Sequence, residues 1–150
     1  MRLITPVERK YLLQRIRAQY GPDKAFEELV LIKTGQGRIR AVTREAFEVA
    51  CRLRGVQQLG LYVAKIVKGD VVLSIEGSQL LDGKIMRNVV ELGDEEAYKW
   101  MKAAPISHSR GLESRYVVAK CGSLYLGSGR VSRDGKIYPQ VAKWRRIPEE

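Results

Sequence analysis

Residues 125–148 of the chain, YLGSGRVSRDGKIYPQVAKWRRIP, carry six Lys or Arg side chains and one acid, Asp134. The six basic residues are Arg130, Arg133, Lys136, Lys143, Arg145 and Arg146. Lysine and arginine neutralise phosphates and release counterions, so a polyanion would bind here through charge. Arg145 or Arg146 could also stack on a splayed nucleobase. We predict that these six residues, together with Lys102 and Arg115, form the binding site for such a partner.

Trp144 lies between Lys143 and Arg145 in a stretch expected to be a strand. Side chains alternate between the two faces of a strand, so Lys143 and Arg145 should share one face and Trp144 the other. We therefore expect Trp144 in the core and the two cations in solvent, with the strand ending before Arg146. The alternative is that Trp144 is an exposed platform on which unpaired bases stack. The second tryptophan, Trp100, is predicted to be core.

The charge of the chain is unevenly distributed. The net charge is +10 over 150 residues. Residues 1–60 hold 12 basic and 6 acidic side chains, residues 61–114 hold 7 and 8, and residues 115–147 hold 8 and 1. A generic charged surface would mix its signs, so this imbalance indicates nucleic acid or, less often, an anionic membrane. No run of 18 apolar residues occurs, so we expect no membrane span.

A catalytic constellation is missing from the sequence. His108 is the only histidine, and the two cysteines, Cys51 and Cys121, stand far apart. These residues cannot supply a nucleophile with a His relay or a four-ligand zinc site. We predict no catalytic residue, no metal and no cofactor. We expect His108 in a polar loop, both cysteines in the core, and a reducing, cytoplasmic setting.

Gly127-Ser128-Gly129 resembles half of a dinucleotide-binding fingerprint, but position 132 is Ser where a third glycine would be needed. The context is also wrong, since a turn and not a helix follows the strand. Glycines within a strand more often mark a bulge or the close approach of another backbone. We expect that role here.

The elements that must position these residues alternate between helices and strands. Thr5-Pro6-Val7-Glu8 is a capping box that predicts a helix over 6–19, and Thr43 can cap a second helix that extends to Arg54. Hairpins are expected over 28–43 and 59–77, with turns at Gly35-Gln36-Gly37 and Lys68-Gly69. Residues 77–84 are expected to form a loop. A strand over 86–92 and a short helix capped by Asp94 follow.

Residues 107–114 are expected to be an exposed loop, and three strands complete the chain over 116–121, 124–132 and 136–144. The predicted fold class is α+β, with a small N-terminal α/β domain over residues 1–85 and a mostly β domain over residues 86–150.

Two segments of the second part carry a family resemblance: MRNVVELGDEEAYKWMKAAPIS (86–107) and ESRYVVAKCGSLYLGSGRVSRDGKI (113–137). They resemble a PUA domain, which is an RNA-binding fold. The shared features are a strand, an acid-capped helix with an aromatic residue, and a strand pair ending in Leu-Gly-x-Gly. The preceding part, with Leu-Gly-Leu-Tyr at 59–62, is similar to the pre-PUA domain of a two-domain eukaryotic and archaeal ribosome-biogenesis factor. The Lys-Trp-Arg-Arg-Ile ending also resembles the RNA-binding domain of Sun-type RNA cytosine methyltransferases.

The resemblance implies a PUA pseudobarrel that binds structured RNA such as rRNA or tRNA. It departs from the full methyltransferases, because the chain has no room for a cofactor-binding domain and no paired catalytic cysteines. We therefore expect a non-catalytic, monomeric protein that binds rRNA precursors in ribosome assembly, with assembly proteins as further partners. The alternatives are an RNA-specificity subunit acting in trans with an RNA methyltransferase, a protein-binding scaffold, and an enzyme of unrecognised chemistry.

Overall fold

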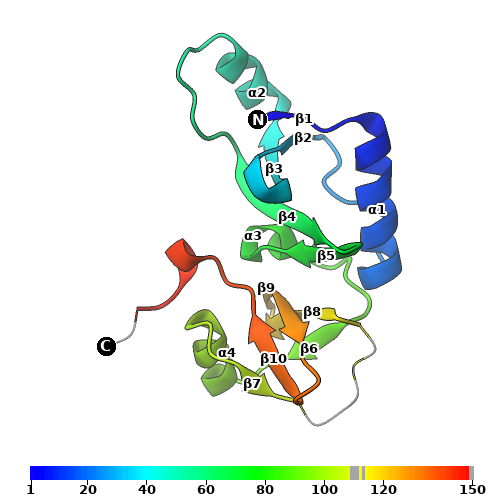
Figure 1. Cartoon of the computed structure of the whole chain (residues 1–150), viewed down its shortest axis with the longest axis vertical. Coiled ribbons are helices and arrows are strands. Elements are labelled where there is room, and N and C mark those ends of the chain that lie inside the picture. The colour runs from blue at the N-terminus through cyan, green and yellow to red at the C-terminus, as the bar shows by residue number, and fades with distance from the viewer. Residues whose placement is uncertain (109–111, 113, 149–150) are drawn as a thin grey trace.

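The computed structural model describes residues 1–108, 112 and 114–148, and within them the chain is α+β with two five-stranded sheets (Figure 1). The first sheet has the order β1-β2-β3-β4-β5, and the second has the order β6-β8-β9-β10-β7. In both sheets the neighbouring strands pair antiparallel, except β6 and β8, which are parallel. The strands are β1 (Arg2–Leu3), β2 (Leu29–Lys33), β3 (Arg38–Thr43), β4 (Leu61–Val67), β5 (Asp70–Leu73), β6 (Val89–Glu91), β7 (Ile106–Ser107), β8 (Tyr116–Cys121), β9 (Leu124–Val131) and β10 (Lys136–Pro139).

Helix α1 (Pro6–Tyr20) covers one face of the first sheet (Figure 1). It begins with the predicted capping box, in which Thr5 Oγ1 accepts from the Glu8 amide and Glu8 Oε1 accepts from the Thr5 amide, both at 3.1 Å. The spacing of Leu12, Leu13, Ile16 and Tyr20 predicts one apolar face, and all of these except the partly buried Leu13 are buried. The helix ends at Gly21, whose φ of 103° is a left-handed conformation that favours glycine.

The other helices are α2 (Arg44–Cys51), α3 (Ile75–Leu80) and α4 (Asp94–Met101), with short 3₁₀ segments η1 (Gly35–Gly37) and η2 (Lys143–Arg145). Helix α4 supplies Trp100, which is fully buried as predicted, and its indole Nε1 donates to the Leu126 carbonyl at 2.9 Å. A Cβ on Gly129 would overlap this indole, so β9 requires a glycine where the ring crosses it.

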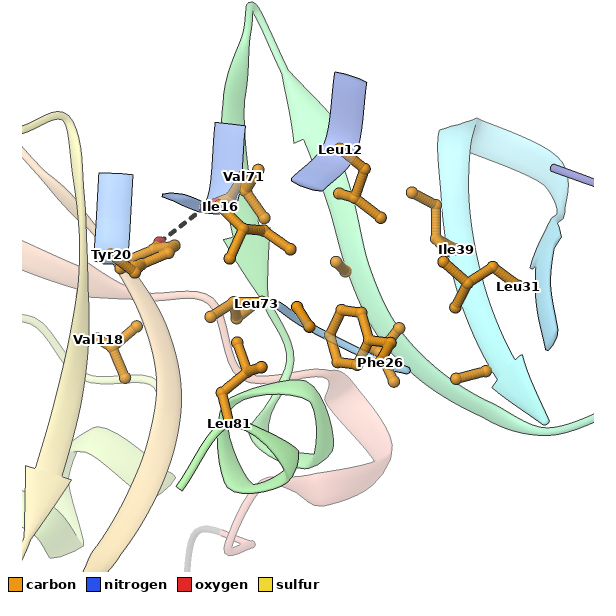
Figure 2. Packing of buried hydrophobic residues seen from close by; sticks show 14 of the residues in the cluster. Leu12, Ile16, Tyr20, Phe26, Leu31, Ile39, Val71, Leu73, Leu81 and Val118 are labelled. Carbon is orange, nitrogen blue, oxygen red and sulfur yellow. Dashed lines mark hydrogen bonds between the residues drawn. The ribbon is translucent and has the colours of Figure 1, made fainter. Parts of the chain in front are cut away.

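The two sheets meet in a shared core. Val118 and Tyr125 of the second sheet belong to the cluster that α1 forms with the first sheet, and Figure 2 shows Val118 beside Tyr20. Buried hydrogen bonds cross the same junction. Tyr20 Oη donates to the Val71 carbonyl at 2.8 Å, and Ser128 Oγ accepts from the Leu73 amide at 2.8 Å. The two side chains hydrogen-bond to the backbone of β5 along its unpaired edge. Without them, these backbone groups would be buried with no hydrogen-bond partner.

The glycine pair of β9 has the predicted role. The register between β8 and β9 shifts opposite Gly127, which has a φ of 80° and forms part of a bulge. The backbone of residues 73–75 approaches a Cβ position on Gly127 to within 3.0–3.3 Å, and the Gly127 amide donates to Ser78 Oγ. The bulge therefore seats the start of α3 against the second sheet.

Several predicted elements are wrong in extent. Residues 77–84 are not only a loop, because α3 occupies 75–80, where Ser74 Oγ caps the Gly77 amide at 2.9 Å. Helix α2 ends at Cys51 and does not reach Arg54. Gly93, not Asp94, is the N-cap of α4. The predicted domain boundary at 85/86 lies in the connection between α3 and β6, and it stays a prediction.

The two cysteines are not core residues. Cys51 is exposed at the end of α2, and Cys121 is partly buried; both are free thiols. The expectation failed because Cys51 lies on a helix with no buried residue. Of the predicted loop 107–114, Ser107 belongs to β7, and His108 is partly buried with its amide donating to the Gly135 carbonyl at 2.7 Å. Residues 109–111 and 113 lie outside the described residues.

Candidate nucleic-acid interface

Trp144 is exposed, not buried, so the core prediction for this residue is wrong. Strand β10 ends at Pro139, and Trp144 lies in the 3₁₀ segment η2 with 63% of its surface exposed. A 3₁₀ turn has three residues per turn and does not alternate its side chains between two faces. Lys143 and Arg145 are therefore not placed by strand alternation, although both are exposed.

A groove lies between the first sheet and the segment that follows β10, and we call it the inter-sheet groove. Its volume is about 470 Å³. The basic and aromatic side chains that line it are Arg38, Tyr62, Lys65, Lys143, Trp144 and Arg146. Pro139, Gln140, Val141, Ala142 and Val72 complete the lining, which contains no acidic residue among the described ones. The groove therefore combines positive charge with ring surfaces.

Arg38 stands between two aromatic rings of this groove. Its guanidinium carbon is 5.4 Å from the centre of the Tyr62 ring and 5.9 Å from that of Trp144. Both distances are within the range of a cation–π contact. Burial raises the pKa of Tyr62, with nearby Arg38 opposing the rise. Arg38 thereby links the Tyr62 ring of β4 to the exposed Trp144 ring, which is far from both residues in the chain.

A second groove, the hairpin groove, lies beside the turn of the β4–β5 hairpin and has a volume of about 550 Å³. Its basic side chains are Lys68, Arg115, Arg130 and Arg133. Arg115 Nε is 2.7 Å from Asp70 Oδ2, and the Arg130 guanidinium lies 4.9 Å from the centre of the Tyr138 ring. Arg130 is opposite both Tyr116 and Tyr138 in the sheet register, so these three side chains share one face.

The β4–β5 hairpin joins the two grooves. Lys65 lines the inter-sheet groove and Val67, two residues along the same strand, lines the hairpin groove. Because side chains two apart point to the same face, the two grooves open on one face of the hairpin. That face is opposite α1, since the alternate residue Ile66 packs in the cluster that α1 forms. From Tyr62 to Val67 the strand spans about 17 Å at ~3.3 Å per residue.

We call the joined grooves the basic surface. It consists of Arg38, Lys65, Lys68, Arg115, Arg130, Arg133, Lys143 and Arg146. Five of the eight predicted residues are therefore brought together, in two groups: Arg115, Arg130 and Arg133 in one, and Lys143 and Arg146 in the other. Arg146 also donates from Nε to the Val141 carbonyl at 3.0 Å, which fixes its side chain at the groove.

Three predicted residues lie outside these grooves. Arg145 Nε is 3.1 Å from Glu76 Oε1, so its charge is paired on the surface. Lys102 lies at the end of α4 with its amine 4.6 Å from the Tyr98 ring centre. Lys136 is exposed at the start of β10. Arg145 follows Trp144 directly in the chain, so it is adjacent in sequence to a residue that lines the inter-sheet groove.

Sequence reasoning missed Arg38, Lys65 and Lys68 as site residues. All three belong to the hairpins of the first sheet, where Arg38 lies on β3, Lys65 on β4 and Lys68 in the turn after it. The excess of basic residues over 1–60 could have indicated Arg38, whereas Lys65 and Lys68 lie in a stretch with no such excess. That excess could not indicate which distant segment Arg38 faces.

Asp134, the one acid within residues 125–148, stabilises the turn between β9 and β10. Asp134 accepts a hydrogen bond from the Tyr138 hydroxyl at 2.8 Å and from the Lys136 amide at 3.0 Å. The hydroxyl contact lowers the pKa of Asp134 and raises the pKa of Tyr138. Asp134 is thereby committed to the β9–β10 turn, which keeps Arg133 and Arg130 at the hairpin groove.

Among residues 1–108, 112 and 114–148, no three His, Cys, Asp or Glu side chains gather closely enough to hold a metal ion. In the same part of the chain, none of the helices has the length and apolar character needed to cross a membrane.

Comparison with known proteins gives no family for the chain. No family model matches it, and no curated protein is similar enough to count as a relative. The functional conclusion therefore rests on the residues and geometry described above.

Proposed function

We propose that the chain is a non-catalytic cytoplasmic RNA-binding protein that resembles a PUA protein and contacts structured RNA, such as rRNA precursors, through the basic surface. The observation that carries the proposal is the composition of the two grooves. Eight Lys or Arg side chains line them, and no Asp or Glu does among the described residues. An anionic backbone would gain several phosphate contacts on one face, with the charge of Arg115 partly offset by its ion pair with Asp70.

RNA is favoured over an anionic membrane because the basic side chains are mixed with rings inside grooves. Membrane-binding surfaces present apolar side chains beside their cations for insertion between lipids. Here Tyr62 and Trp144 lie around Arg38 within a concave lining. Aromatic rings and arginine planes are the surfaces on which RNA-binding proteins stack bases.

The experiment is to crosslink the tagged protein to RNA in cells by ultraviolet light and to sequence the attached fragments. The proposal predicts enrichment of rRNA precursors. A variant with Lys65→Glu and Arg130→Glu, one charge reversal in each groove, should lose most of the crosslinked RNA at equal protein level. Recovery of the same RNA by this variant, or no RNA above background for the wild type, would contradict the proposal.

A second candidate, a specificity subunit that guides an RNA-modifying enzyme in trans, is favoured by a separate observation. Val49, Leu53 and Leu61 expose 52–60% of their surfaces on and after α2. Exposed apolar side chains can mark a contact with another protein. Purification of the tagged protein after nuclease treatment distinguishes the candidates, since an RNA methyltransferase that stays bound without RNA would favour the second.

A further inference from the structure

Trp144 has one ring face occupied and a large exposed area. Arg38 lies over the indole at 5.9 Å, yet 63% of the residue remains exposed. A cation over one face leaves the other face open to a flat partner. An exposed indole presents a flat apolar surface to water, and a base that stacks on it removes that surface from water.

The inter-sheet groove has the size and charge for one nucleotide. Its volume of about 470 Å³ lies within the usual range of small-ligand sites, roughly 300–1,000 Å³. Lys65, Lys143 and Arg146 line it beside Trp144, so a phosphate attached to a stacked base would meet cations from both sides of the groove. A base inside a duplex cannot stack on the indole, because its neighbours in the stack cover both of its faces, whereas an unpaired base can be splayed out.

Resting on the proposed function, we propose that the inter-sheet groove binds a single unpaired nucleotide of RNA, with the base on Trp144 and the phosphate on Lys65, Lys143 and Arg146. Arg38, held between Tyr62 and Trp144, positions the indole by covering its other face. The hairpin groove, which contains charge but no exposed tryptophan among its lining residues, then follows the backbone of the neighbouring nucleotides.

The chain offers an internal reporter for this contact. It has two tryptophans, and Trp100 is fully buried with its indole Nε1 bonded to the Leu126 carbonyl. Stacking of a base on Trp144 should quench only the emission of Trp144. The probes are a short single-stranded RNA of mixed sequence and a fully paired duplex that contains the same sequence, each added to the wild-type protein and to the Trp144→Phe and Trp144→Leu variants.

The proposal predicts saturable quenching of the wild type by the single strand and binding of the duplex about tenfold weaker without quenching. In Trp144→Phe the quenching should vanish while anisotropy of labelled RNA still reports binding within about threefold of wild type, since a ring remains. In Trp144→Leu affinity for the single strand should fall about tenfold while the far-ultraviolet circular dichroism spectrum shows that the fold is kept.

Equal affinity for single strand and duplex, with Trp144→Leu binding as wild type does, would overturn this inference and leave the proposed RNA binding standing. Failure of the wild type to bind either RNA would overturn the proposed function, and this inference with it. Quenching that persists in Trp144→Phe would place the contact elsewhere and would also refute the assignment.

Discussion

Replacement of each tryptophan by alanine should have very different effects on stability. Trp100 is fully buried and donates to the Leu126 carbonyl. Its loss opens a large cavity and orphans that carbonyl, and substitutions of this kind cost about 3–5 kcal/mol. Trp144 is 63% exposed, so the area it buries is roughly 90 Å² if a whole side chain buries up to ~250 Å². At ~25 cal/mol/Å² the upper limit is about 2 kcal/mol.

The expected cost for Trp144→Ala is about 1 kcal/mol, because the unfolded chain already hides part of this area and alanine keeps some of the contact. Urea unfolding followed by far-ultraviolet circular dichroism measures both variants without relying on tryptophan emission. Equal destabilisation by the two substitutions would refute the exposed position of Trp144. A cost below about 1.5 kcal/mol for Trp100→Ala would refute the packing of α4 on β9.

Three further substitutions test the fold. Ser128→Ala removes the partner of the buried Leu73 amide and should cost about 1–3 kcal/mol in urea unfolding, whereas Ser123→Ala in an exposed turn should cost less than about 0.5. Gly129→Ala places a methyl group against the buried indole and should lower stability by about 1–3 kcal/mol by the same measurement. In the folded state the hydrogen bond from the Arg2 guanidinium, as the largest cause, lowers the pKa of the Glu8 carboxyl. The stability that Glu8 contributes is therefore present above the ordinary pKa of 4.5 and is lost as the pH falls below it. Urea unfolding at pH 6 and pH 3 should therefore show the advantage of wild type over Glu8→Gln shrinking at the lower pH.

Local signals in the sequence predicted the parts of the fold that depend on neighbouring residues. The capping box at Thr5 and the tight turn at Lys68-Gly69 each form within a few residues, so their patterns suffice. Helix α3 was missed because Gly77 and Ser78 are poor helix formers. Its stability comes from distant contacts: Ser78 Oγ accepts from the Gly127 amide, and a Cβ at Gly77 would overlap the Val63 carbonyl.

The candidate site was predictable only in its C-terminal half. Charge counting indicated Arg130, Lys143 and their neighbours, because the excess is local in the sequence. Arg38 and Lys65 join them through the packing of two sheets, which no local pattern encodes. Trp144 was misplaced because the alternation argument assumed a strand beyond Pro139, whereas Pro139 has no amide hydrogen for a ladder and the chain turns into η2.

The central claim is that the basic surface binds RNA through its charges, and the salt dependence of binding tests it most directly. Binding of a single-stranded RNA is measured by fluorescence anisotropy over a series of KCl concentrations. Each phosphate contact contributes about −0.7 to the slope of log K against log salt, so four to six contacts give roughly −3 to −4. Lys65→Ala with Lys143→Ala, in the inter-sheet groove, should flatten the slope by about 1.4.

The matched control is Lys10→Ala with Lys24→Ala, which removes the same net charge on and just after α1, away from both grooves. The account predicts that this control keeps the wild-type slope to within about 0.5, while the groove variant loses the stated amount. A wild-type slope near zero, or an equal flattening in both double variants, would contradict the claim that the basic surface is where RNA binds.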